Sequence, residues 1–324
     1  MKAVFLGTPE FAVATLERML EAGIEVAEVV TQPDRPQGRK QEMIPSPVKA
    51  AALRLGLPIY QPERIRRADA LEHLRAIAPD VMVVVGYGQL IPQAVIDIPR
   101  LGIVNVHGSV LPELRGAAPI QWAVARGYEK TGVTTMCIDA GLDTGDVVDS
   151  WETEIGPEET ALELNPRLAA AGAELLVKTL AGLADGSAKK IPQDNDKATH
   201  APILKKEDGR IDWRKPAKEI HNQVRGLLPW PGAHTVFRGQ TLQIWRARMT
   251  DRRWDLAPGS LIREHGVREH GVREHGLREA GVFAVGGDSS AIELLEVQAE
   301  GRKRMAADVF ANGSRLVEAE QLGG

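Results

Sequence analysis

The chain has 324 residues, 43% of them hydrophobic and 26% charged, which is the ordinary mixture of a soluble globular protein. This composition excludes a disordered chain, a collagen-like fibre and a coiled coil, and the length predicts two domains. The longest apolar run, near residues 81–85, is too short to cross a bilayer, and the first residues lack a signal-peptide pattern. The single cysteine, Cys137, excludes a disulfide framework, so we expect a cytoplasmic protein that does not act at a membrane.

Charge is distributed unevenly along the chain. The formal net charge is −4, yet residues 189–253 carry 15 Lys and Arg against 7 Asp and Glu, a local excess of +8. A basic segment on an acidic chain is typical of proteins that bind a phosphate backbone. The alternative is a solvated linker followed by the polar face of a sheet.

The first part of the chain alternates between strand-like and helix-like patterns. Strands are expected at residues 3–6, 26–31, 81–85, 103–106 and 133–138. Ser46 followed by Pro47 predicts the start of a helix, and residues 162–183 are expected to form a long helix. This alternation predicts an α/β domain at residues 1–189, with a Rossmann-like, mostly parallel sheet and helices on both faces.

The pattern changes after residue 183. A polar and basic stretch at residues 190–205 is predicted to be a linker, and short strands are expected at residues 233–237, 241–247, 282–285 and 291–297. Short strands with glycine turns predict a small β-barrel or sandwich at residues 206–324.

A pentapeptide repeat interrupts this second domain at residues 263–282. A period of five matches neither helix nor strand, so the repeats present no constant apolar face and predict a loop between two strands. His265, His270 and His275 offer an alternative, a metal cluster, but such a loop rarely pre-organises ligands, so we expect no metal.

Several common catalytic motifs are absent from the sequence. The first strand is followed by Gly7-Thr8-Pro9-Glu10 instead of Gly-x-Gly-x-x-Gly, and there is no Walker loop, His-Glu-x-x-His or Gly-x-Ser-x-Gly. These absences argue against a dehydrogenase, an NTPase, a zinc protease and an ordinary serine hydrolase.

Three residues suggest chemistry at a strand end. Asn105 and His107 are two positions apart on an expected strand, so both project from one face. An amide donor beside an imidazole suits a reaction that passes through a tetrahedral oxyanion, and Asp143 on a glycine-flanked loop can orient the imidazole. The alternative is that Asn105 and Asp143 cap turns and His107 is a satisfied buried histidine.

Taken in order, these motifs resemble those of the folate-dependent formyltransferases. Asn-x-His-x-Ser-x-Leu-Pro occupies residues 105–112, and Asp-x-Gly-x-Asp-x-Gly-Asp occupies residues 139–146. Further similar runs lie at residues 6–12, 31–36, 45–49, 115–121, 229–233 and 301–313. The resemblance covers nearly the whole chain except the repeats, and it is closest to the branch of the family that acts on initiator methionyl-tRNA.

The resemblance implies the reaction and its participants. The co-substrate would be 10-formyltetrahydrofolate, and its formyl group would pass to the α-amino group of methionine on the initiator tRNA for translation initiation. Asn105, His107 and Asp143 would be catalytic. The folate would be bound by Ser109, Val110, Leu111, Pro112, Gly88, Leu90 and Gly141.

The same resemblance implies where the tRNA is bound. The second domain would be an oligonucleotide-binding (OB)-like barrel, and a proline-framed loop at residues 33–45 would reach the acceptor arm. The basic residues implied are Arg39, Lys205, Lys206, Arg246 and Arg248. No obligate protein partner is implied.

Three rival functions remain open at this point. Another formyltransferase, acting on a glycinamide ribonucleotide or a sugar amine, would share the catalytic residues but would not need the basic segment. A hydrolase would release formate from the folate with no acceptor. A tRNA-binding module with a relic site would bind tRNA without turnover.

Overall fold

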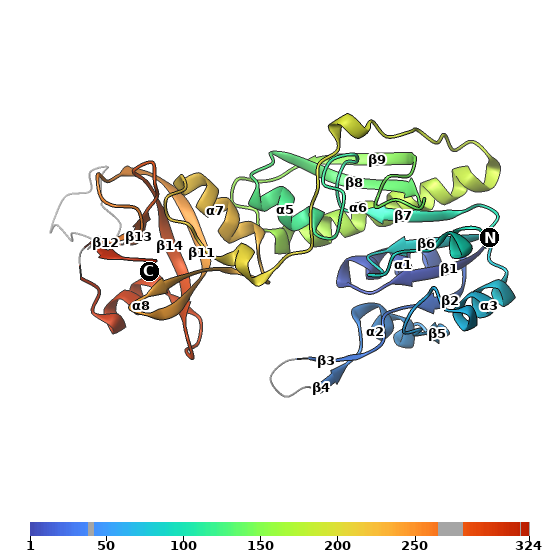
Figure 1. The fold of residues 1–324 in the computed structure, drawn as a ribbon, viewed down its shortest axis with the longest axis horizontal. Helices are drawn as coiled ribbons and strands as arrows, with labels where there is room; N and C mark the ends of the chain where they lie inside the picture. Colours follow the sequence, from blue (N-terminus) through green and yellow to red (C-terminus); the bar gives the residue numbers. More distant parts are fainter. Residues whose placement is uncertain (38–41, 265–280, 318, 324) are drawn as a thin grey trace. The chain divides into compact units, whose positions relative to one another are not determined.

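The computed structural model describes residues 1–37, 42–264, 281–317 and 319–323 (Figure 1). The chain divides into two compact units. The first consists of Met1–Ile120, Lys130–Glu154 and Glu163–Ile203, and the second of Gln121–Glu129, Ile155–Leu162 and Leu204–Gly324.

A seven-stranded sheet organises the first unit, in the order β5-β2-β1-β6-β7-β8-β9. The strands are β1 (Lys2–Gly7), β2 (Glu25–Val30), β5 (Ile59–Tyr60), β6 (Val81–Val85), β7 (Ile103–His107), β8 (Lys130–Cys137) and β9 (Val147–Glu154). The pairs from β5 to β7 are parallel, and β8 and β9 are antiparallel to their neighbours. The predicted Rossmann-like, mostly parallel sheet is therefore confirmed.

Helices cover both faces of this sheet. The helices in this part of the chain are η1 (Glu10–Ala12), α1 (Val13–Glu21), α2 (Pro47–Arg54), α3 (Ala68–Ile77), α4 (Gln93–Ile96), α5 (Pro119–Ala125) and α6 (Ala161–Asp185). Alternate residues of a strand point to opposite faces, so Phe5 packs with residues of α1, α2 and α6 and Leu6 with residues of α3 and α4. The predicted helix start is confirmed, since Ser46 Oγ accepts a hydrogen bond from the Lys49 N–H at 3.1 Å.

The proline-framed loop contains a short hairpin that the sequence did not predict. Strands β3 (Arg35–Gln37) and β4 (Glu42–Ile44) pair antiparallel. Each is three residues long and one contains Pro36, a combination that gives no recognisable strand pattern. Arg39, the residue expected to contact the tRNA, lies outside the described residues.

The second unit is built on an antiparallel sheet in the order β10-β11-β14-β13-β12-β16, with β15 paired to β14. The strands are β10 (Ala233–Phe237), β11 (Gln240–Arg253), β12 (Ser260–Glu264), β13 (Gly281–Val285), β14 (Ser290–Ala299), β15 (Met305–Ala306) and β16 (Glu320–Gln321). The sheet is curled into a half-barrel, the form that the predicted small β-barrel takes here (Figure 1).

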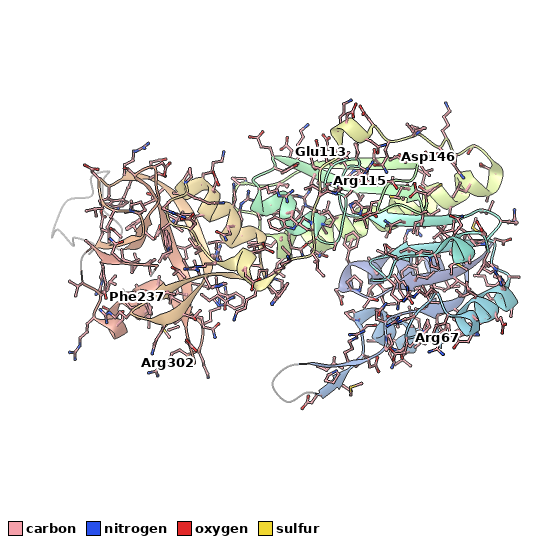
Figure 2. All side chains as sticks on the ribbon, viewed as in Figure 1. Arg67, Glu113, Arg115, Asp146, Phe237 and Arg302 are labelled. Carbon is pink, nitrogen blue, oxygen red and sulfur yellow. The ribbon has the colours of Figure 1, made fainter. Side chains whose placement is uncertain are left out.

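The core of the second unit lies between this sheet and two helices, α7 (Ala217–Gly226) and α8 (Ala307–Ser314). Phe237 of β10, labelled in Figure 2, meets Phe310 of α8 edge to face, with ring centroids 5.3 Å apart. The 3-10 turns η2 (Asn195–Lys197) and η3 (Lys206–Gly209) belong to the segment that follows α6.

The pentapeptide repeats connect two neighbouring strands. The last residue of β12, Glu264, pairs with the first residue of β13, Gly281. Residues 265–280 between them lie outside the described part of the chain. Among the helices that the structure describes, none is long and apolar enough to cross a membrane.

Candidate active site

The candidate site is built on β7, which lies between β6 and β8 in the sheet of the first unit. Asn105 and His107 occupy alternate positions of this strand and are 8% and 5% exposed. Their side chains therefore project from the same face, as the spacing predicts, and are almost fully withdrawn from water.

The side chain of Asn105 is available to a ligand. Within the described part of the chain, no group hydrogen-bonds its amide, and the side chain is only 8% exposed. Its N–H groups therefore suit an oxygen on which negative charge develops during a reaction.

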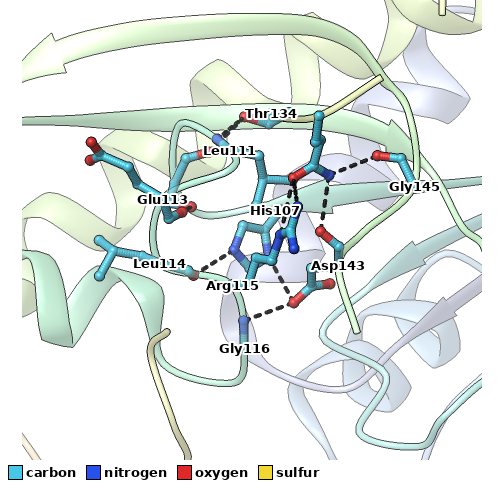
Figure 3. Close-up of polar contacts among 11 residues, drawn as sticks. His107, Leu111, Glu113, Leu114, Arg115, Gly116, Thr134, Asp143 and Gly145 are labelled. Atoms are coloured by element: carbon cyan, nitrogen blue, oxygen red, sulfur yellow. Dashed lines mark hydrogen bonds and ion pairs between the residues drawn. The ribbon is translucent and has the colours of Figure 1, made fainter. Parts of the chain in front are cut away.

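His107 is fixed on one side by the backbone. Its Nε2 lies 3.0 Å from the carbonyl oxygen of Leu114 (Figure 3). Because a carbonyl oxygen accepts and never donates, Nε2 carries the proton and Nδ1 is the nitrogen that can gain one. Nδ1 faces Asp143 Oδ2 at 3.8 Å, a distance that permits charge stabilisation but exceeds a direct hydrogen bond.

Asp143 reaches His107 through a loop that turns back along the sheet. Since β8 runs antiparallel to β7, its last residue, Cys137, pairs with Val104 near the beginning of β7. The chain then returns, with Asp143 in the left-handed region at φ +53° and its Oδ2 accepting the Gly116 N–H at 2.8 Å.

Two further residues, which sequence reasoning missed, support this loop. Gln193 Nε2 donates to the carbonyl oxygens of Asp143 and Gly145 at 2.9 and 2.7 Å. The buried guanidinium of Arg115, labelled in Figure 3, donates to Gln193 Oε1 from Nε and Nη2 at 3.1 and 2.8 Å. Gln193 is isolated in a polar stretch and forms no motif, and Arg115 begins the similar run at residues 115–121, which by itself indicates no role for this side chain.

The four residues expected to bind the folate after β7 form a tight turn. Ser109 is 1% exposed, and its Oγ donates to the carbonyl oxygen of Glu113. The Leu111 N–H donates to Thr134 Oγ1 at 3.1 Å. This turn, which also includes Val110 and Pro112, is therefore held in shape by a hydrogen bond of its own and by Thr134 of β8.

The other expected folate residues lie on two neighbouring loops. Gly88 has φ +86°, a conformation that favours glycine, and Leu90 is 79% exposed. At Gly141 a Cβ would lie 1.9 Å from Thr144 Oγ1, so a larger residue would displace the turn that carries Asp143. Small or apolar groups at these positions leave surface that a flat aromatic ligand can cover.

Burial shifts the pKa of two groups near the site. Burial raises the pKa of Tyr87, in the loop after β6, to about 12, so its phenol stays protonated. Burial also raises the pKa of the Cys137 thiol, which makes this side chain a poor nucleophile. Neither group therefore competes with His107 as a base.

Apart from Arg39, the expected tRNA-binding residues belong to the second unit. Lys205 and Lys206 are exposed at η3, and Arg246 and Arg248 are exposed on β11. Arg248 forms an ion pair with Glu293, whereas the other three form no ion pair with any residue that the structure describes.

The described residues contain no group of three His, Cys, Asp or Glu side chains placed to hold a metal ion. The three histidines of the repeats lie outside the described residues. The polar groups at the candidate site are an amide, an imidazole and a carboxylate.

Comparisons with known proteins agree with the motifs. A family model described as formyl transferase matches residues 1–180, and one described as formyl transferase, C-terminal domain, matches residues 203–315. A methionyl-tRNA formyltransferase of Solibacter usitatus is 57% identical over 100% of this chain and 99% of its own length. A protein of the same name from Bacillus velezensis is 42% identical over 99% of this chain and 98% of its own.

Solved structures share the fold at low identity. An N-formyltransferase from Helicobacter canadensis, in complex with folinic acid and dTDP-3-aminofucose, aligns with a TM-score of 0.66 at 18% identity, over 91% of this chain and 98% of that one. HypX from Aquifex aeolicus, in complex with tetrahydrofolic acid, aligns with a TM-score of 0.63 at 16% identity, over 96% of this chain and 47% of that one. At such identities these structures support the fold alone.

Proposed function

The chain belongs to the formyl transferase family, and from this premise we propose that it transfers the formyl group of 10-formyltetrahydrofolate to the α-amino group of methionine on initiator methionyl-tRNA. The choice of acceptor is supported by relatives named methionyl-tRNA formyltransferase that are 42–57% identical over at least 98% of this chain. The product would be formylmethionyl-tRNA.

The observation that carries the chemistry is the free amide of Asn105 beside His107 on one buried strand face. When bound, 10-formyltetrahydrofolate supplies the formyl carbon and a nitrogen that leaves it. The Asn105 amide donates a hydrogen bond to the formyl oxygen as negative charge develops there. Since the amide is buried and already in place, little reorganisation accompanies the reaction.

His107 handles the proton of the attacking amine. The new bond joins the methionine nitrogen to the formyl carbon, and His107 Nδ1 takes the proton that this nitrogen loses. Asp143, at 3.8 Å, stabilises the imidazolium while it lasts. The proton then goes to the departing nitrogen of the folate as its bond to carbon breaks, which returns His107 to its neutral form.

The folate is proposed to lie across the turn after β7 and the loops after β6 and β8. The residues proposed to contact it are Ser109, Val110, Leu111, Pro112, Gly88, Leu90 and Gly141. Support comes from the exposed side chain of Leu90 and from Gly88, where a Cβ would meet nothing closer than 3.9 Å and the backbone is open to a ligand.

The tRNA is proposed to bind mainly to exposed cations. Those in the described residues are Lys205, Lys206, Arg246 and Arg248, and Arg39, which lies outside the described residues, is proposed to contribute as well. Three of them form no ion pair within the part of the chain that the structure describes, so no internal carboxylate competes with a phosphate for them.

The domain extents, the location and the partners are part of this proposal. We assign the catalytic domain to residues 1–189, the linker to residues 190–205 and the tRNA-binding domain to residues 206–324. The acceptor tRNA is a component of the translation machinery, so we propose a cytoplasmic protein without an obligate protein partner.

The test is mass-spectrometric detection of the formylated product. The full chain is incubated with 10-formyltetrahydrofolate and, in separate arms, methionyl initiator tRNA, uncharged tRNA, a nucleotide-linked amino sugar, glycinamide ribonucleotide, or no acceptor. Formylmethionine on the charged tRNA alone supports the proposal. Formylation of either small amine, or loss of the folate's formyl group without an acceptor, would instead establish one of the rival activities.

A further inference from the structure

We propose that Gln193 is a positioning residue, which holds Asp143 at the distance from His107 that formyl transfer needs. This inference rests on the proposed function. Gln193 lies 50 residues beyond Asp143, in the segment that follows α6, and donates both N–H groups of its amide to the carbonyl oxygens of Asp143 and Gly145. These two hydrogen bonds fix the backbone on both sides of Thr144. They do not involve the Asp143 carboxylate, which faces His107.

The orientation of the Gln193 amide is set by Arg115. A guanidinium has donors and no acceptor, so the two N–H groups that point at Gln193 require its Oε1. The amide nitrogen must then face the two carbonyl oxygens. Arg115 is itself 5% exposed, and its Nη2 also donates to Asn195 Oδ1 at 2.9 Å.

The loop needs such a support because of its own geometry. Asp143 has φ +53°, a left-handed conformation that residues other than glycine adopt uncommonly, although asparagine and aspartate adopt it more often than the rest. The loop must also turn back from the end of β8 to reach His107. Gly116 holds the carboxylate end of Asp143, and Gln193 holds its backbone.

The same segment also fixes the other partner of His107. Thr199 accepts the Arg115 N–H at 2.9 Å through its carbonyl oxygen and the Leu114 N–H at 2.8 Å through its hydroxyl. The Ala201 N–H donates to the Arg115 carbonyl oxygen at 2.7 Å. Because the Leu114 carbonyl oxygen binds His107 Nε2, residues 193–201 support both groups that flank the imidazole.

The sharpest substitution is Gln193→Glu. It preserves an oxygen for Arg115 but replaces two N–H donors with an oxygen that faces two carbonyl oxygens, which repels the Asp143 loop. We expect kcat to fall about 10- to 100-fold, the usual effect of misplacing a catalytic group by a fraction of an ångström to 1 Å. The KM values for folate and tRNA should change by less than about threefold, because the displaced group acts on the reaction and not on ground-state binding.

Gln223→Glu is the matched control. The Gln223 amide also donates to two backbone carbonyl oxygens, those of Asp208 and Arg210 at 2.8 and 3.1 Å, but in the second unit. It applies the same chemical change away from the site, so it should leave kcat within about twofold of the unmodified protein. A fall in kcat as large as that of Gln193→Glu would overturn the proposal.

A double-mutant cycle with Asp143→Asn tests whether Gln193 acts through Asp143. Asparagine tolerates the left-handed conformation, so the loop is retained while the charge is lost. Once that charge is gone, adding Gln193→Glu should lower kcat by no more than about threefold, because the two residues serve one step. Additive losses, or an unchanged kcat in Gln193→Glu alone, would overturn the proposal.

Hydrogen exchange supplies a readout that does not depend on activity. In the Gln193→Glu protein, amide exchange of residues 139–146 should be faster than in Gln223→Glu, and exchange of β6 and β7 should be unchanged. Unchanged exchange in residues 139–146 would contradict the positioning role. If the unmodified protein formylates no methionyl-tRNA, the proposed function is wrong. The exchange result then still tests whether Gln193 holds the loop that carries Asp143.

Discussion

The candidate catalytic residues of the first unit and the candidate tRNA-binding residues of the second occupy opposite environments. Asn105 and His107 are at most 8% exposed, and His107 and Asp143 are each held by a backbone group. Lys205, Lys206 and Arg246 are exposed and form no ion pair with described residues.

This difference follows from what each region has to do. A reaction needs donors held within a fraction of an ångström, which burial and second contacts provide. Attraction to a phosphate backbone needs positive charge at the surface, where solvated and adaptable side chains suffice. Single substitutions should therefore be severe in the first unit and gradual in the second.

The largest effect is expected for Asn105→Ala. Removal of a buried donor to a developing oxyanion should lower kcat about 100- to 1,000-fold, with little change in tRNA affinity. The measurement is the initial rate of formylmethionyl-tRNA formation at saturating folate and tRNA. A loss below about tenfold would show that the amide does not meet the oxyanion and would weaken the contrast between the two regions.

The second effect concerns the exposed cations and is read from its salt dependence. In the triple variant Lys205→Ala, Lys206→Ala, Arg246→Ala, tRNA binding should weaken, and the slope of log affinity against log salt should become shallower by about one for each phosphate that the protein no longer neutralises. Saturating kcat should be unchanged. Fluorescence titration with initiator tRNA at several salt concentrations measures the affinity and the slope.

The matched control removes the same charge elsewhere. Arg64, Arg66 and Arg75 are exposed cations of the first unit, and their triple replacement by alanine also lowers the net charge by three. Only the second-unit variant should change the slope. Equal slopes in both variants would mean that binding reflects net charge and not a particular surface.

How far the sequence predicts this molecule depends on whether the signal is local. The continuous apolar, valine-rich run at Val81–Val85 predicts a covered parallel strand, and the two-residue spacing of Asn105 and His107 predicts their shared face. Both follow from geometry within a few residues, and the structure agrees with both.

The rest of the site depends on contacts that leave no local signal. His107 is held by the Leu114 carbonyl oxygen, a backbone group that any residue carries. Gln193 meets Asp143 across 50 residues, from a stretch without periodicity. Such contacts are created by the tertiary fold, so a single sequence can indicate the reacting groups but not the residues that hold them in place.

The third prediction concerns two glycines of the second unit whose replacement should change the stability of the fold but not tRNA binding. A Cβ added at Gly226 of α7 would lie 2.3 Å from the Ala125 nitrogen, whereas one at Gly313 of α8 meets nothing within 4 Å. Gly226→Ala should therefore lower the free energy of unfolding by about 1–3 kcal/mol. Gly313→Ala should raise it by about 0.5–1 kcal/mol, because alanine restricts the unfolded chain.

Urea unfolding monitored by tryptophan fluorescence measures both changes. Since neither glycine has a side chain to bind RNA, the tRNA salt slope of the stably folded variants should match that of the unmodified protein. If Gly313→Ala instead lowered the free energy of unfolding, the backbone at the end of α8 would need glycine for a reason other than the space around it.

The smallest effect concerns His221, a buried titratable group of the second unit. Unlike the candidate tRNA-binding residues of that unit, it is not at the surface. His221 is 3% exposed, and burial, the largest influence, lowers its pKa below the usual 6.5, as does the charge of Arg225. Glu158, whose Oε2 lies 3.3 Å from His221 Nε2, and a hydrogen bond with the backbone of Ala247 act in the opposite direction.

The sign of the pH dependence follows from this lowered pKa. Below about pH 6.5 the unfolded chain binds a proton at His221 more readily than the folded chain does, so stability is complete above that pH and declines as the pH falls. His221→Gln should reduce the difference in urea midpoint between pH 7.5 and 5.5. Glu158→Gln should increase that difference, because removing the carboxylate lowers the pKa of His221 further. Identical pH profiles in the unmodified protein and both variants would show that His221 does not contribute to acid sensitivity.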